Sequence, residues 1–204
     1  GTRPLRLGTA SGDEVRVEGK VDRVDCYHGS DRDYIRVIDY KTGGKKFDLS
    51  EVVQGLNMQM LLYLFTLGEN GVADLPSPGE AGVLYMPGSG HFTRDRRDAS
   101  AESIAEDQRK NYCMSGMVLD NPEVIEAMEL GTAGRYIPVS LKKDGSYTAA
   151  SSVITEEQLG LLRRQIAGNV VRMAELLHEG KIGAVPANRN GRLPCEYCDY
   201  RSVC

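Results

Sequence analysis

The sequence of 204 residues lacks several features that would assign it to other classes of protein. It has no run of about 18 apolar residues, which a membrane-spanning helix requires, and its start lacks the basic-then-apolar pattern of a secretory signal. We therefore expect a cytoplasmic protein with no membrane partner. A G-x-x-x-x-G-K-[ST] phosphate loop is also absent, so these residues alone cannot drive an ATP-dependent motor.

An excess of positive charge is absent as well. The chain carries 25 Lys and Arg against 29 Asp and Glu, a net charge of −4. This balance argues against coating nucleic acid through bulk charge, although it leaves room for a local basic channel. Internal repeats, low-complexity tracts and linkers are missing too, so we predict a single domain over residues 1–204. Because the chain starts without Met, we expect it to be a piece of a longer protein.

Alternating hydrophobicity predicts paired strands. Residues 14–25 alternate between valine and polar side chains, and residues 34–41 are apolar on both sides, as a central strand is. With the turn residues between them, these segments predict a hairpin. Residues 80–87 predict a further strand, and residues 135–152 a second hairpin that turns at an Asp-Gly pair.

Helical patterns fill the segments between these strands. Residues 51–67 are apolar on nearly every face and predict a buried helix. Residues 91–134 are more polar and predict a helical insert of two pieces. The clearest helix follows Thr155, which forms a capping box with Gln158, and ends near Gly180. The expected fold class is therefore α/β.

Asp39 and Lys41 place opposite charges at the end of an otherwise apolar strand. Alternate residues of a strand project side by side, and hairpin pairing would bring Asp22 to the same end of the sheet. Taken alone, the pair could be an ordinary ion pair at a strand terminus. Two convergent acids with a lysine also suit phosphodiester hydrolysis, because carboxylates hold Mg²⁺ ions that activate water and the lysine stabilises the transition state.

Gln59 and Tyr63 add a Q-x-x-x-Y spacing, which places both on one face of a helix. Alone, they could be two polar tips on a buried helix. After the D-x-K strand, however, the combined pattern resembles the RecB-like branch of the PD-(D/E)XK nuclease superfamily. The resemblance implies a restriction-endonuclease-like core, a central mixed sheet flanked by helices. It also implies catalytic roles for Asp22, Asp39, Lys41, Gln59 and Tyr63, and a Mg²⁺ or Mn²⁺ site that involves Asp22, Asp39 and Tyr40.

Three of the five cysteines stand at the end of the chain, as Cys195, Cys198 and Cys204 in a C-x2-C-x5-C pattern. In a cytosolic protein such spacing indicates a metal or an iron-sulfur cluster before a disulfide. Three thiolates are one short of the four that a zinc or [4Fe-4S] site requires. Cys26 and Cys113 we interpret as isolated free thiols.

Most of the chain resembles the C-terminal nuclease region of AddB-type helicase-nuclease subunits, from "GKVDRVD" through "RVIDYKTGGKKFDLSEVVQGLNMQMLLYL" to the cysteine motif at 195–204. The resemblance implies that a leading helix and a fourth cluster-binding cysteine lie upstream of residue 1. The [4Fe-4S] cluster is then incomplete or absent in this chain, and its nuclease activity weak or absent. DNA and an AddA-type helicase-nuclease subunit are the implied partners.

Several charged residues are further candidates. Lys45 and Lys46 follow the active-site strand and are candidates for DNA contacts. Asp25 lies three residues after Asp22, so it points to the opposite face and we interpret it as structural. We interpret the scattered histidines as surface or helix-end residues: His28, His91 and His178. Three arginines are weaker candidates for DNA contacts: Arg94, Arg96 and Arg97.

Three functions remain open from the sequence. The first is a Mg²⁺-dependent DNA exonuclease domain of a helicase-nuclease complex that acts in double-strand-break repair by recombination. The second is a stand-alone nuclease of the CRISPR spacer-acquisition type, against which the insert at 91–134 argues. The third is a catalytically silent structural or DNA-docking module, against which Asp22, Asp39 and Lys41 argue.

Overall fold

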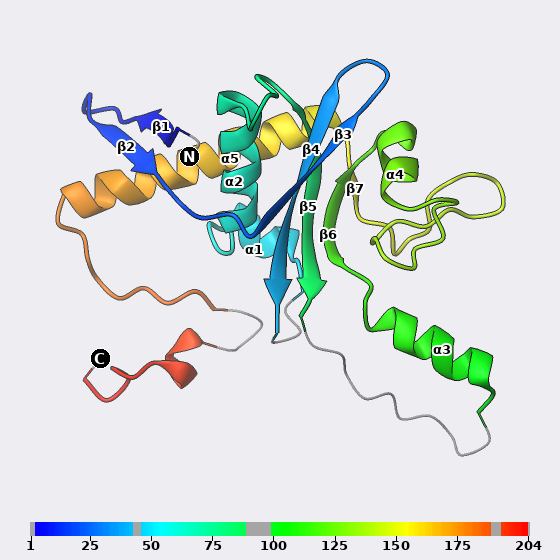
Figure 1. Ribbon diagram of the computed structural model, residues 1–204. Coiled ribbons are helices and arrows are strands. Elements are labelled where there is room, and N and C mark those ends of the chain that lie inside the picture. The colour runs from blue at the N-terminus through cyan, green and yellow to red at the C-terminus, as the bar shows by residue number, and fades with distance from the viewer. Residues whose placement is uncertain (1–2, 43–45, 89–98, 189–192, 204) are drawn as a thin grey trace.

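A computed structural model of the chain describes residues 3–42, 46–88, 99–188 and 193–203 (Figure 1). Its centre is a mixed sheet of five strands in the order β3-β4-β5-β6-β7. The β3/β4 and β5/β6 pairs are antiparallel, and the β4/β5 and β6/β7 pairs are parallel. The strands are β3 Arg23–His28, β4 Asp33–Lys41, β5 Gly79–Pro87, β6 Ser115–Leu119 and β7 Val153–Ile154.

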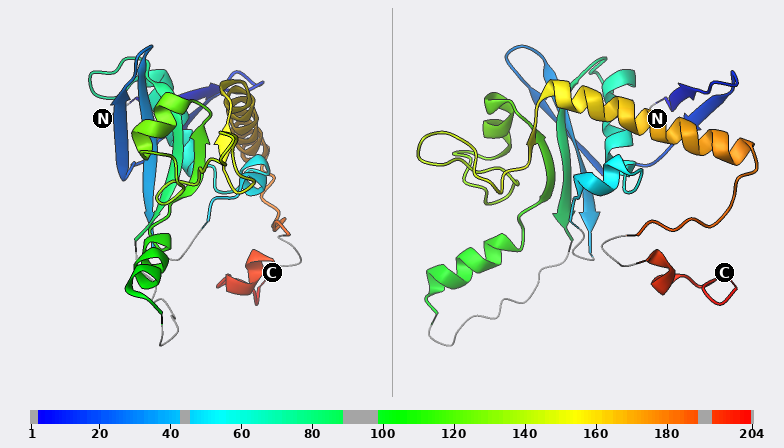
Figure 2. Two further views of the ribbon diagram at one scale, coloured as in Figure 1. Left: turned by 90° about the vertical axis from the view of Figure 1, so that its right-hand side faces the viewer. Right: turned by 180° about the vertical axis from the view of Figure 1, so that it is seen from behind.

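Helices cover both faces of this sheet (Figure 2). On one face lie α1 (Leu49–Val53), α2 (Gln59–Asn70) and the long α5 (Glu156–His178), and on the other lies α4 (Pro122–Met128). Strand β4 is therefore buried on both sides, as its two-sided apolar pattern predicts. Its side chains divide between two core clusters: Ile35 and Val37 pack with Leu61 and Leu64 of α2, and Ile38 packs with Leu84 and Ile125.

The segment 14–25, predicted as one strand, is divided between two sheets. Its first part is β2 (Glu14–Val17), which pairs antiparallel with β1 (Leu5–Gly8), and only its second part joins β4 as β3. Strand pairing ends at Val17, and two residues later a Cβ atom on Gly19 would lie 2.2 Å from Cε1 of Tyr63. The Gly19 backbone packs against the Tyr63 ring of α2, and this close contact interrupts the strand.

The buried helix predicted at 51–67 is also divided in two. Between α1 and α2, Gly55 (φ 87°) and Asn57 (φ 54°) adopt left-handed conformations that end the first helix and turn the chain into the second. In contrast, α5 begins as predicted. Thr155 Oγ1 accepts a hydrogen bond from Gln158 N at 3.2 Å, and Gln158 Oε1 accepts one from Thr155 N at 3.0 Å, so the capping box is confirmed.

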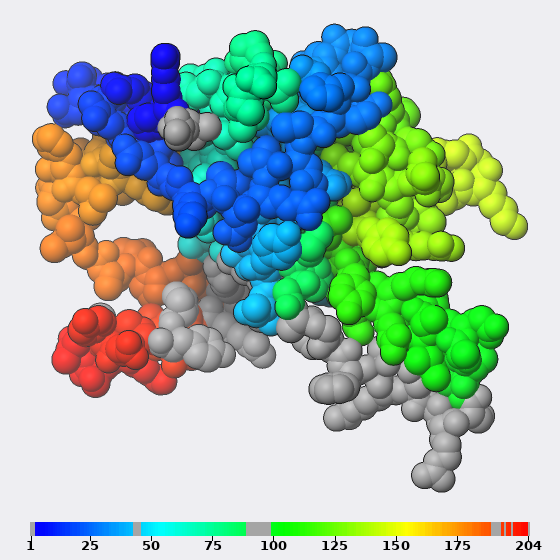
Figure 3. All heavy atoms as spheres, viewed as in Figure 1, coloured from blue at the N-terminus to red at the C-terminus, as the bar shows by residue number. Residues whose placement is uncertain are grey.

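The segment 91–134 is only partly the helical insert that the sequence predicts. Its helices are α3 (Ala101–Lys110), which extends away from the sheet, and α4 (Figures 1 and 3). Between them, however, β6 enters the central sheet beside β5. Glycine permits this close pairing, because a Cβ atom on Gly116 would lie 2.0 Å from the Val83 carbonyl oxygen.

The predicted second hairpin at 135–152 has the expected turn but little strand. Gly145 takes a left-handed φ of 81°, and the Lys142 N–H donates to Ser146 O at 2.7 Å. Its arms are joined by one isolated bridge, Leu141 to Tyr147, and by backbone hydrogen bonds such as Thr148 N–H to Ser140 O at 3.0 Å. Among the residues that the structure describes, no helix is long and apolar enough to span a membrane.

Candidate active site

Asp39 and Lys41 meet at the carboxyl end of β4. They lie on the α2 face of the sheet, as their spacing from Ile35 and Val37 predicts. Lys41 Nζ forms an ion pair with Asp39 Oδ2. Asp39 is only 8% exposed, and its buried Oδ2 has no partner with the geometry of a hydrogen bond. The interaction with Asp39 raises the pKa of Lys41 against the opposing effect of burial, so the ammonium form is stabilised.

The structure brings Asp22 to the same end of the sheet. Asp22 immediately precedes β3, and its Oδ2 accepts a hydrogen bond from the Tyr40 N–H at 3.4 Å. The negative charge of Asp22 also contributes to the raised pKa of Lys41. Asp22 is exposed and Asp39 is buried, so the two carboxylates present one accessible and one inward-lying ligand group.

These oxygen atoms suit a hard divalent cation. Carboxylate and backbone carbonyl oxygens are the ligands that Mg²⁺ prefers, and a buried carboxylate oxygen without a hydrogen bond is one that a cation would satisfy. Within the described ranges, no three His, Cys, Asp or Glu side chains gather around one metal position. The site therefore offers two carboxylates, and water or substrate oxygens would have to complete the coordination, as is common for Mg²⁺.

Gln59 and Tyr63 lie on one face of α2, as the Q-x-x-x-Y spacing predicts. Gln59 is the first residue of the helix, and its Nε2 donates a hydrogen bond to Tyr63 Oη at 2.8 Å. The Tyr63 ring packs against the Gly19 backbone, three residues before Asp22. This helix face is therefore in contact with the segment that leads into Asp22.

Tyr85 is a residue of this site that the sequence analysis missed. It lies on β5 directly beside Asp39 in the parallel register, and it is 5% exposed. Lys41 Nζ lies 5.5 Å from the centroid of its ring. An aromatic side chain in an apolar strand is typical of a protein core, and only the β4/β5 register, which a sequence pattern does not reveal, places it next to the acid.

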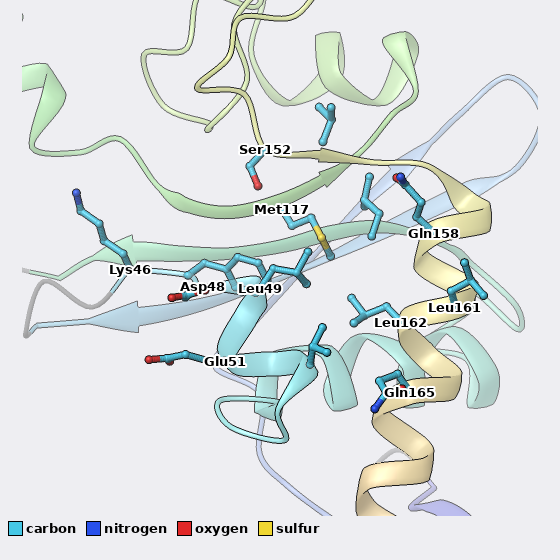
Figure 4. A pocket seen from close by; sticks show the side chains of 14 residues that line it. Lys46, Asp48, Leu49, Glu51, Met117, Ser152, Gln158, Leu161, Leu162 and Gln165 are labelled. Carbon is cyan, nitrogen blue, oxygen red and sulfur yellow. The ribbon is translucent and has the colours of Figure 1, made fainter. Parts of the chain in front are cut away.

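A groove with a volume of about 900 Å³ lies beside the Asp39 site rather than at it. It runs between α1, β7 and α5. Figure 4 shows apolar side chains such as Met117 and Leu162 in this groove, whereas Glu51 and Lys46 point out of it, on the side where β4 ends. Lys46 is exposed there, while its predicted companion Lys45 lies outside the described residues.

The predicted cluster ligands are described only in part. Cys195 belongs to a short 3₁₀ turn (Pro194–Tyr197), and the Cys198 N–H donates to the Cys195 carbonyl at 3.2 Å. Cys204 lies outside the described residues, so the structure presents two of the three thiols and the [4Fe-4S] site stays a prediction. Cys26 and Cys113 are free thiols, and burial raises the pKa of both.

The other candidates have structural partners or fall outside the description. Asp25 lies on the sheet face opposite Asp39, as the sequence predicts, and it pairs there with Arg36. His28 Nδ1 lies 2.6 Å from Asp33 Oδ1, and His178 Nδ1 lies 3.7 Å from Asp13 Oδ2. Four residues lie outside the described ranges: His91, Arg94, Arg96 and Arg97.

Comparison with known proteins agrees with this geometry. The family profile of the PD-(D/E)XK nuclease superfamily matches residues 1–204. The chain belongs to this superfamily. Its mixed sheet flanked by helices is the architecture expected of a PD-(D/E)XK nuclease, so the predicted fold class is confirmed.

Relatives of this PD-(D/E)XK chain are described as subunits of an ATP-dependent helicase/deoxyribonuclease. The chain is 35% identical to that of Clostridium perfringens over 207 residues, 36% to that of Clostridium novyi over 204, and 32% to that of Caldanaerobacter subterraneus over 203. Each alignment covers 98% of this chain and 18% of the relative. The chain thus spans about a fifth of the length of these relatives.

Proposed function

We propose that this chain is a nuclease domain that hydrolyses phosphodiester bonds of DNA and depends on Mg²⁺ or Mn²⁺. The observation that carries the proposal is the meeting of Asp22, Asp39 and Lys41 at one end of the β3/β4 pair, where the buried Asp39 Oδ2 pairs with Lys41 and Asp22 is exposed. Membership of the PD-(D/E)XK superfamily and the deoxyribonuclease descriptions of the relatives support it.

Each residue has a defined task in this proposal. Asp22, Asp39 and Tyr40, the last through its backbone, would hold the cation, which when bound supplies a water of lowered pKa and neutralises charge on the phosphate. Lys41, held as an ammonium beside Asp39, stabilises the charge that develops in the transition state. The Gln59 and Tyr63 face of α2 positions the DNA strand, and exposed Lys46 contacts phosphate outside the cleavage position.

The relatives support a setting within a larger enzyme. We infer that the domain acts as an exonuclease in a cytoplasmic helicase-nuclease complex, with an AddA-type partner, in double-strand-break repair by recombination. We further propose that Cys195, Cys198 and Cys204 bind a [4Fe-4S] cluster, with a fourth ligand from outside this chain. Iron content and visible absorbance should therefore be low in this chain and stoichiometric in the longer protein. A full cluster in the short chain would show that another ligand completes the site.

Cleavage assays on linear DNA test the nuclease proposal. The longer protein should degrade DNA with Mg²⁺ or Mn²⁺ and stop when the cation is chelated. Asp39→Ala or Lys41→Ala should abolish this degradation while an unchanged circular-dichroism spectrum shows that the domain is folded. Degradation that continues in Asp39→Ala would contradict the assignment. DNA binding without cleavage by the wild-type protein would instead favour the silent docking module.

A further inference from the structure

We propose that Tyr85 is a positioning residue whose ring holds the Lys41 ammonium beside Asp39. The contact between Tyr85 and Lys41 is a property of the fold, and its consequence for catalysis rests on the proposed nuclease function. None of the roles assigned to Asp22, Asp39, Lys41, Gln59 or Tyr63 includes this contact.

The strand register places Tyr85 in the same row as the acid. Asp39 of β4 is paired with Tyr85 of β5, and Tyr85 is paired in turn with Ser115 of β6. Tyr85 and Val83 contribute to the core cluster on the α2 face, which is the face that Asp39 and Lys41 share. The aromatic ring therefore stands beside the carboxylate, on the side away from Asp22.

Lys41 needs such a guide because its side chain is long and has four rotatable bonds. Its side chain is 28% exposed, so solvent and the Asp22 carboxylate both compete with Asp39 for the ammonium. The Tyr85 ring centroid lies 5.5 Å from Lys41 Nζ, within the range over which an aromatic face attracts a cation. Asp39 and Tyr85 together hold the ammonium from two neighbouring strands.

The ring itself is fixed by the segment that follows β4. Phe47 packs against Tyr85 with centroids 6.3 Å apart and ring planes inclined by 51°. The Phe47 N–H donates a hydrogen bond to Ser115 Oγ at 2.8 Å, which ties this segment to β6. Tyr85 is thus enclosed between the sheet and Phe47, and an enclosed ring can define where a flexible lysine rests.

Three substitutions separate the ring, the hydroxyl and general packing. Tyr85→Phe keeps the ring, whereas Tyr85→Leu removes it. Phe65→Leu is the matched control, because Phe65 is 2% exposed in the same core cluster and its ring lies 5.1 Å from the Arg163 guanidinium rather than near Lys41.

Ring-current shifts of the lysine side chain measure the contact directly and need neither cation nor DNA. In the lysine-labelled chain, with Lys41→Arg used only to assign the signal, the Lys41 ε-methylene protons should be shifted upfield. The shift should persist in Tyr85→Phe and Phe65→Leu and disappear in Tyr85→Leu. Absence of the shift in the wild-type chain, or its persistence in a folded Tyr85→Leu variant, would overturn the proposal.

Steady-state cleavage by the longer protein tests the consequence. Tyr85→Leu should lower kcat roughly 10- to 100-fold with little change in KM for DNA, because a misplaced ammonium stabilises the transition state less but leaves DNA binding unchanged. Tyr85→Phe should restore kcat to within about threefold of wild type. Raised KM at unchanged kcat would contradict a positioning role. If the wild-type protein cleaves no DNA, the nuclease proposal fails, while the ring-current measurement still decides whether Tyr85 holds Lys41.

Discussion

Strands β3 and β4 carry two charged groups on opposite faces, and the two groups are satisfied in different ways. On one face, Asp25 Oδ1 accepts from Arg23 Nε at 2.6 Å and its Oδ2 accepts from Arg36 Nη2 at 2.7 Å. Burial favours a higher pKa for Asp25, but the two guanidinium groups outweigh it and lower the pKa below its ordinary value. On the other face, Lys41 is the one basic partner of Asp39 among the described residues, and its Nζ pairs with the buried Oδ2.

An ion pair in a strand is therefore not what marks a functional site. Both carboxylates have a basic partner two or more residues away, and sequence spacing alone assigns them similar chemistry. The distinguishing feature is the number of basic partners. Asp25 has two guanidinium groups, whereas the buried Asp39 has a single ammonium partner among the described residues, so its carboxylate keeps acceptor capacity that a bound cation would use. On the face of Asp25, the unpartnered buried atom is Arg36 Nη1, which is a donor and cannot bind a cation.

The largest expected difference between the two faces is in catalysis. Asp39→Asn keeps the shape of the side chain but removes its charge, so DNA cleavage by the longer protein should fall on the order of 10³-fold. Asp25→Asn makes the same chemical change on the opposite face and should leave kcat within about twofold. Equal losses in the two variants would show that the faces act as one site.

For stability, the substitution at Asp25 should have the larger effect and the one at Asp39 the smaller. Asp25→Asn leaves two guanidinium groups without their anion, and because Arg36 is 18% exposed we expect a loss of about 1–3 kcal/mol in the free energy of unfolding. Asp39→Asn should cost less, because it relieves a buried charge and leaves only one, more exposed ammonium without its anion. Urea unfolding of both variants measures this, and a larger loss in Asp39→Asn would reverse the interpretation of the two faces.

Sequence alone predicts the features of this site that depend on local periodicity. Asp39 and Lys41 share a face because strand side chains alternate, and Gln59 reaches Tyr63 because they are one helical turn apart. The Thr155 capping box is likewise a local pattern. Each of these positions follows from the identity and spacing of neighbouring residues.

Contacts between distant segments could not be predicted in this way. Tyr85 lies beside Asp39 only because β5 returns parallel to β4 after α2. The break at Gly19 depends on the Tyr63 ring, which belongs to a helix far along the sequence. Strand β6 was missed because a five-residue strand within a polar segment has too few positions to display a two-residue period.

Glu129 extends the comparison to a third carboxylate, one that is satisfied entirely by backbone. It is 7% exposed and accepts four N–H hydrogen bonds of 2.8–3.1 Å, from Ala133, Arg135, Tyr136 and Ile137. Burial favours a higher pKa, but these four bonds together lower the pKa of Glu129 below 4.5. Its ionised form therefore stabilises the fold.

The pH dependence follows from the direction of that shift. A carboxylate whose pKa is lower in the folded state contributes fully above the unfolded value of 4.5, and its contribution is lost as pH falls below 4.5. Glu129→Gln should thus cost about 1–2 kcal/mol in free energy of unfolding at pH 7. The difference in stability between the variant and the wild type should narrow as the pH falls below 4.5. A gap that does not change with pH would show that packing, and not ionisation, explains the loss.

Lys46 has the smallest expected effect, because its charge is exposed rather than held by a partner like that of Lys41. If it contacts a phosphate, Lys46→Ala should weaken DNA binding a few-fold and reduce the slope of log affinity against log salt by about one. Lys142→Ala is the matched control, since Lys142 is also exposed, in the turn before Gly145. Binding measured by fluorescence anisotropy between about 50 and 200 mM salt gives both slopes. Equal slopes in the two variants would show that Lys46 faces solvent and that the phosphate contact lies elsewhere. A change confined to Lys46→Ala would instead extend the DNA path from the Asp39 end of β4 along the segment that leads to α1.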